Sequence, residues 1–305
     1  MEKVLPIVTP SPPAYFKENV KTKLSPFFWS SLTIIAGLAL TLCIAPRQQE
    51  YLEVNDIVTP TVSAGPGIAY FFGVVAVMAL VLFIIPLSKL RLVFRLLFAL
   101  MFAWGVFILT ALTLPLWAAY PLAVIAGIAW LFWARVWLHN LVLLIALVSA
   151  GSVFGSLFSP WAFLILMAVI AVYDFVAVRF GFMVWMVDRL SQTVTLPAFI
   201  YPRKIRDWTL SLKTVRVDEL VDRPADDREY SILGGGDIGF PLVLTASVYF
   251  VSGLNAAVLV GAFALVGLMS AFLIQLVWLK GKPMPALPPI AFFCLIGLLI
   301  ALYLW

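Results

Sequence analysis

The sequence has few of the residues that most enzymes use for nucleophilic catalysis or for metal binding. One histidine, two cysteines and an 11% share of charged residues are spread over 305 positions. A zinc site of the HExxH type needs two histidines, so this chemistry is excluded and we expect no metal or other cofactor. His139 lies at the end of an apolar run, where we expect an interface residue rather than a catalyst. Cys43 and Cys294 lie inside apolar runs and are expected to pack rather than to form a disulfide.

Apolar residues, in contrast, make up 64% of the chain, and the mean hydropathy is +1.08. A soluble domain with this composition would lack enough polar side chains to cover its surface. The apolar runs are continuous and about 20 residues long, which favours membrane helices over a β-barrel. The composition therefore predicts an all-α protein that crosses the membrane several times.

Short polar breaks divide the apolar sequence into nine predicted spans. Pro115, Pro121, Arg135 and His139 supply the breaks within residues 95–158. The predicted spans are 25–45, 64–87, 95–117, 118–137, 139–158, 160–187, 236–253, 256–280 and 285–305.

The basic residues give the predicted orientation. Nearly all of them fall on one side of a nine-span arrangement, and the other side receives Arg47 within a loop that also carries Glu50, Glu53 and Asp56. Because Lys and Arg collect in cytoplasmic loops, the N-terminus is expected in the cytoplasm and the C-terminus outside. The same placement explains the net charge of +5 without a nucleic-acid partner.

We therefore expect a cytoplasmic tail over 1–24, six transmembrane helices within 25–187, a cytoplasmic loop over 188–235 and three helices within 236–305. The loop holds eight basic and eight acidic residues. Partial alternation in residues 209–217 predicts a short strand there. An edge strand beside an active site could bind an unwound substrate by strand addition.

Two carboxylates stand apart from all the others because they lie in or at the start of apolar runs. Asp174 is in the middle of the sixth span, and Asp237 follows three glycines at the start of the seventh. A carboxylate at the centre of a membrane helix costs about 2.5–3.5 kcal/mol, and such residues usually mark functional sites. A purely structural Asp174 would need a partner, and Arg179 is badly placed five residues along the helix. Asp237 taken alone could be a helix N-cap.

Two neighbouring aspartates would together supply general acid–base chemistry. They cannot both ionise cheaply, so they share a proton; the ionised one can activate water while the protonated one hydrogen-bonds a carbonyl. This arrangement hydrolyses peptides without a metal. The alternative is a transporter or channel that uses the aspartates as proton or cation sites. A purely structural scaffold would leave the two carboxylates unexplained.

Three motifs resemble those of the presenilin and signal peptide peptidase family of intramembrane aspartyl proteases. They are Tyr173-Asp174 in the sixth span, Gly234-Gly235-Gly236-Asp237 before the seventh, and Pro285-Ala286-Leu287 before the ninth. The family carries YD, GxGD and PAL motifs in this order. Gly235 departs from the leucine that many relatives have at that position.

The resemblance implies that Asp174 and Asp237 form a catalytic dyad. It also implies that Tyr173, Gly234, Gly236, Pro285, Ala286 and Leu287 shape the active site or bind substrate. By the same analogy, the substrates are single-span membrane proteins cleaved in the bilayer of the cell membrane. A hydrophilic cavity should open from the dyad toward the cytoplasm. Oligomers and accessory subunits are left open.

Overall fold

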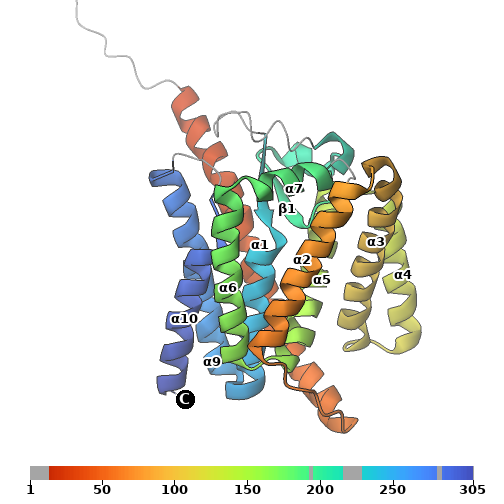
Figure 1. Cartoon of the computed structure of the whole chain (residues 1–305), viewed down its shortest axis with the longest axis vertical. Helices are drawn as coiled ribbons and strands as arrows, with labels where there is room; N and C mark the ends of the chain where they lie inside the picture. The colour runs from red at the N-terminus through yellow and green to blue at the C-terminus, as the bar shows by residue number, and fades with distance from the viewer. Residues whose placement is uncertain (1–13, 192–194, 216–228, 280–283, 305) are drawn as a thin grey trace, which may run out of the picture.

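The computed structural model describes residues 14–191, 195–215, 229–279 and 284–304 (Figure 1). Within these ranges the chain is mostly helical and contains one two-stranded sheet. The helices are α1 (Ala14–Val54), α2 (Ala64–Ile84), α3 (Leu87–Ala111), α4 (Leu116–Phe132), α5 (Val136–Leu157), α6 (Pro160–Arg179), α7 (Phe182–Ser191), α9 (Gly235–Val277) and α10 (Leu287–Leu304). The strands are β1 (Ala198–Pro202) and β2 (Tyr230–Gly234), with the 3-10 helices η1 (Ile205–Thr209) and η2 (Leu212–Thr214) between them.

Seven of the described helices are long and apolar enough to cross a membrane. They are α1, α2, α3, α5, α6, α9 and α10, while α4 is apolar but only 17 residues long. The predicted class, a multi-pass helical membrane protein, is confirmed.

Helix α9 is 43 residues long but is not straight. Gly253 has φ 80° and ψ −173°, a conformation that is not helical and that glycine adopts without a steric penalty. A Cβ built on Gly261 would lie 3.6 Å from Thr245 Oγ1, although residues 245 and 261 would be about 24 Å apart in a straight helix. The two halves of α9 therefore fold back against each other at Gly253, between the predicted spans 236–253 and 256–280.

The expected span over 160–187 is instead two helices. Helix α6 ends at Arg179, Gly181 has φ 73°, and α7 starts at Phe182. A left-handed residue ends a helix, so α7 is free to take a new direction. Trp185, Met186 and Leu190 of α7 lie in a small apolar cluster with residues of α2 and α3.

The strand predicted over 209–217 is wrong for its described part: Thr209 ends η1, Leu212–Thr214 form η2, and Ser211 makes only an isolated bridge with Arg135. Residues 216 and 217 lie outside the described ranges. The strands that do form flank this segment: β1 pairs antiparallel with β2, with Ala198 opposite Gly234 and Ile200 opposite Ile232. Alternation in a short sequence did not distinguish a strand from consecutive 3-10 turns.

The helices stand side by side with the sheet at one end (Figure 1). The beginning of α1, helix α7 and β1 lie at that end, and the last turn of α10 lies at the other. Two buried apolar clusters fill the interior: one joins α6, α9 and α10, and the other joins α3, α4, α5 and the sheet. The first half of α9 contributes Leu242 to one cluster and Val243 to the other, so this half of the helix lies where the two clusters meet.

Candidate active site

Asp174 lies on the face of α6 that packs into the protein. Ser159 caps the helix by accepting a hydrogen bond from the Ala162 N–H at 3.3 Å, and Pro160 occupies the first turn. Phe163, Met167 and Ile170 are buried at helical spacing on this face, and Asp174 follows four residues after Ile170. Its side chain is half-buried.

Asp237 lies in the first turn of α9. The N-cap of this helix is Gly234, so the alternative that Asp237 is itself the N-cap is wrong. Its carboxylate reaches back to the backbone N–H of Gly234, as acidic residues at the third helical position often do. A Cβ built on Gly234 would lie 3.1 Å from Asp237 Oδ2.

The fold brings the two aspartates together. The negative charge of Asp174 acts directly on the Asp237 carboxyl. The backbone N–H of Leu287, the first residue of α10, interacts with the Asp174 carboxyl as a hydrogen-bond donor. The beginnings of α9 and α10 and the inner face of α6 therefore meet at one pair of carboxylates.

The PAL segment reaches this site through its backbone. Leu287 is only 2% exposed, whereas Pro285 and Ala286 are half-buried just before α10. A Cβ on Gly267 would lie 2.7 Å from the Ile290 Cα, so the second half of α9 supports the first turn of α10 at backbone contact. Pro283, the first proline of this region, lies outside the described residues.

Tyr173 packs against aromatic rings and makes no polar contact within the described residues. Its ring makes edge contacts with Phe71 and Phe72 of α2, at centroid distances of 6.1 and 5.4 Å. Its hydroxyl is buried and, among the residues described, has no hydrogen-bond partner. Tyr173 therefore packs α6 against α2 beside Asp174, and no hydrogen bond orients the aspartate from this side chain.

The three glycines before Asp237 differ in what surrounds them. A Cβ on Gly235 would lie 2.8 Å from the Pro197 carbonyl oxygen, which also accepts the Gly235 N–H at 2.9 Å. A Cβ on Gly236 would meet only the movable ring of Phe240, at 2.9 Å. The departure from leucine at position 235 thus has a structural reason here, because the chain just before β1 approaches this residue too closely for a side chain.

The sheet was missed by sequence reasoning, and so were two residues that hold it. His139 was expected at the interface, but it is fully buried in the first turn of α5, and Asn140 beside it is 7% exposed. Both side chains bond to β1. Two adjacent polar residues at the start of an apolar helix were the available signal.

The tyrosines of the sheet remain uncharged at neutral pH. Burial raises the pKa of the Tyr201 hydroxyl, and burial together with the negative charges of Asp207 and Glu229 raises the pKa of Tyr230. The sheet therefore brings no phenolate charge toward the aspartates.

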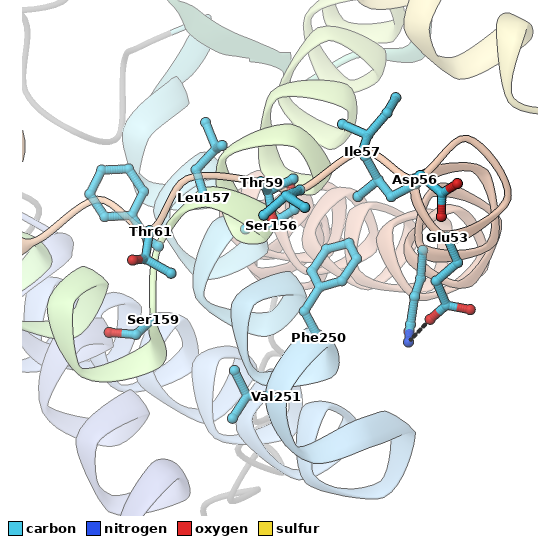
Figure 2. Close-up of a pocket in the computed structure, with 15 residues that line it drawn as sticks. Glu53, Asp56, Ile57, Thr59, Thr61, Ser156, Leu157, Ser159, Phe250 and Val251 are labelled. Atoms are coloured by element: carbon cyan, nitrogen blue, oxygen red, sulfur yellow. Dashed lines mark hydrogen bonds between the residues drawn. The ribbon is translucent and has the colours of Figure 1, made fainter.

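A cavity of about 620 Å³ lies between the end of α1, the end of α5 and the reversal of α9 (Figure 2). Its lining includes Glu53 in the last turn of α1, Asp56 just after that helix, and Phe250 and Val251 near Gly253. Phe250 is about 20 Å along the helix from Asp237. This cavity does not include the aspartates, and the hydrophilic cavity expected beside them stays a prediction. Within the described ranges, no cluster of three or more His, Cys, Asp or Glu residues is placed to hold a metal.

The fold resembles solved structures of a presenilin family intramembrane aspartate protease. In space group C222 that protein is 17% identical, with 92% of this chain and 98% of the other covered and a TM-score of 0.58. In space group P2 the coverage and identity are the same and the TM-score is 0.57. At this identity the likeness shows a shared fold. Comparison with curated proteins finds no match.

The family assignment rests on nearly all of the membrane portion of the sequence. The family model described as "Signal-peptide peptidase, presenilin aspartyl protease" matches residues 31–304. This range contains all three motifs and all the helices that meet at the two aspartates. The chain therefore belongs to the presenilin and signal peptide peptidase family of intramembrane aspartyl proteases.

Proposed function

We propose that this protein is a GxGD-type intramembrane endopeptidase in which Asp174 and Asp237 activate water between them. The observation that carries the proposal is the meeting of two carboxylates, from α6 and α9, at the ends of otherwise apolar helices. Carboxylates in membrane spans are costly and are retained for function.

The chemistry needs only the two side chains and water. The ionised aspartate removes a proton from water, and the resulting hydroxide attacks the scissile carbonyl while the protonated aspartate donates to its oxygen. Collapse of the tetrahedral intermediate breaks the C–N bond, and the leaving nitrogen takes a proton from the dyad. The two carboxyls titrate as a pair, so neither is assigned a fixed role. The Leu287 N–H interacts with the Asp174 carboxyl and would help to keep it oriented.

The substrate would be a single-span membrane protein whose helix unwinds near the dyad. A helical peptide bond is shielded by its own hydrogen bonds, so cleavage requires an extended segment. Strand β2 ends at Gly234, and the Gly234 N–H is turned toward the Asp237 carboxylate. The backbone of an extended substrate segment paired with β2 would therefore lie beside the aspartates.

We further propose nine crossings of the cell membrane with the N-terminus in the cytoplasm. The seven long spans, the shorter α4 and the reversal of α9 at Gly253 together support this count. The beginning of α1 and the end of α10 lie at opposite ends of the molecule, as an odd number of crossings requires.

The test is cleavage of a labelled single-span protein in reconstituted liposomes. We expect Asp174→Asn and Asp237→Asn to lose cleavage by at least about 100-fold, the lower range of general acid–base contributions. Asp56→Asn is the matched control, because Asp56 has φ 50° in a loop far from the site and asparagine tolerates this conformation.

The proposal fails if wild-type protein cleaves no substrate across a range of sequences and pH, or if either variant cleaves at the wild-type rate. Proton or cation flux through the same liposomes, lost in both variants, would instead support the transporter alternative.

A further inference from the structure

The outer edge of β1, the edge that faces away from β2, is occupied by side chains of α5. Asn140 Nδ2 donates to the Ile200 carbonyl oxygen at 2.7 Å, and Asn140 Oδ1 accepts from the Ile200 N–H at 3.0 Å. A carboxamide presents a donor and an acceptor side by side, as the backbone of a neighbouring strand does. Asn140 thus takes the place of a third strand at Ile200.

His139 bonds to the same edge two residues earlier. Its Nε2 lies 3.0 Å from the Ala198 carbonyl oxygen, and the Trp130 indole N–H donates to its Nδ1 at 3.2 Å. An indole only donates and a carbonyl only accepts, so the imidazole carries its hydrogen on Nε2 and donates it to Ala198. His139 and Trp130 are both fully buried, and these two bonds fix the orientation of the ring.

The register shows which edge remains open. Pro197 and Arg203, the odd-numbered neighbours of β1, bond to Gly235 and Glu229, so odd-numbered residues of β1 face β2. Ala198 and Ile200 face outward and bond to α5, and Pro202, the third outward residue, has no N–H. By the same alternation, Ile232 turns its N–H and carbonyl to the outer edge of β2, and Gly234 turns its carbonyl there while its N–H faces the Asp237 carboxylate. Within the described sheet, β2 is therefore the edge that can accept another strand.

The bonds between α5 and β1 also help to set the position of Asp237. The Pro197 carbonyl accepts the Gly235 N–H, and a Cβ at Gly235 would be 2.8 Å from that oxygen. Since β1 is bonded to α5 on one edge and to β2 and Gly235 on the other, α5 sets the position of β2 relative to the first turn of α9. That turn carries Asp237.

We propose that His139 and Asn140 are positioning residues that hold the sheet on α5, so that an extended substrate pairs only with β2 and presents one particular peptide bond to the aspartates. This inference rests on the proposed protease function. The pair acts through the sheet and contacts neither carboxylate. Its loss should change where the substrate is cut, which a purely stabilising residue would not do.

The test uses the full chain in liposomes and measures all cleavage products by mass spectrometry. Asn140→Leu keeps the side-chain size but removes both bonds to Ile200. We expect the ratio of products cut at neighbouring bonds to the principal product to rise about tenfold, because two buried hydrogen bonds no longer hold the sheet. Ser149→Ala is the matched control: Ser149 is also buried on α5, but its hydroxyl donates to Gly105 of α3 at 2.7 Å, away from the sheet.

Two variants of His139 test the proposal even if Asn140→Leu does not fold. His139→Gln can still donate to Ala198 and should keep a product pattern close to wild type, whereas His139→Leu cannot and should broaden it. Unchanged product ratios in folded Asn140→Leu, or in both histidine variants, would overturn the inference while leaving the protease function intact. A wild-type protein that cleaves nothing would overturn the protease function itself.

Discussion

At the scale of single residues, the site depends as much on absent side chains as on the two carboxylates. Asp237 Oδ2 lies 3.1 Å from the position of a Cβ at Gly234, and the Gly234 N–H faces the same carboxylate. Gly234 has φ −57° and ψ 138°, which any residue adopts readily. A side chain at position 234 would therefore press on the Asp237 carboxylate, while the backbone conformation there places no demand for glycine.

Gly234→Ala should consequently lower the turnover number with little effect on stability. The added methyl group would displace the Asp237 carboxylate by a fraction of an ångström, and misplacement by about 1 Å can cost about 100-fold in rate. We expect a decrease of about 10- to 100-fold, measured as kcat on a single-span substrate, with an unchanged unfolding temperature. Gly65→Ala is the control, since a Cβ there has no atom within 4 Å. A fully active Gly234→Ala protein would show that the carboxylate has room to move.

At the scale of helices, small residues let the backbones approach at the points that set the site. A Cβ on Gly155 of α5 would lie 2.4 Å from the Ala246 Cβ of α9, and a Cβ on Gly267 would lie 2.7 Å from the Ile290 Cα of α10. Close approach through small residues is the usual way in which membrane helices pack, since lipid offers no hydrophobic driving force between them. These contacts hold the first half of α9 against α5, and the first turn of α10 against the second half of α9.

Gly267→Ala tests whether the helix that carries Leu287 must lie this close. The methyl group would press on the α10 backbone, and overpacking of this kind costs about 1–3 kcal/mol. We expect a lower unfolding temperature in detergent and a lower cleavage rate, because the Leu287 N–H would move away from Asp174. Gly73→Ala should change neither quantity, because its Cβ would meet nothing within 4 Å. A stable and fully active Gly267→Ala protein would mean that α10 can shift without cost.

At the scale of the whole molecule, the arrangement places the sheet, α7 and the beginning of α1 at one end, with the last turn of α10 at the other. Arg47, Glu50 and Glu53 lie in the last turns of α1, not in the loop expected from the sequence, and Asp56 follows just after the helix. If the basic end is cytoplasmic, the open edge of β2 receives its substrate from the cytoplasmic side of the bilayer.

Cysteine labelling in intact cells tests this orientation. In a background with Cys43 and Cys294 replaced by alanine, Asp56→Cys and Arg206→Cys introduce thiols at two exposed positions. A membrane-impermeant maleimide should label the first in intact cells and the second only after lysis. The reverse pattern would invert the proposed orientation, and labelling of both positions in intact cells would contradict the odd number of crossings between them.

The sequence by itself determined the membrane class, the family motifs and the two aspartates, because each depends on composition or on residues close together in the chain. Continuous apolar runs predict spans whatever their neighbours are, and a carboxylate in such a run is conspicuous without a structure. The reversal near Gly253 was also predicted, from the break between two apolar runs.

Only the tertiary structure decided how these parts meet. The sheet pairs segments almost thirty residues apart around a stretch whose alternation pointed to the wrong strand, and long-range pairing is not encoded in a local pattern. The buried role of His139 depends on Trp130 and β1, which reach it from other elements. Tyr173 turned out to be a packing residue and Gly235 a close-contact residue for the same reason. What surrounds a side chain is set by elements distant in sequence, and the sequence around it does not reveal them.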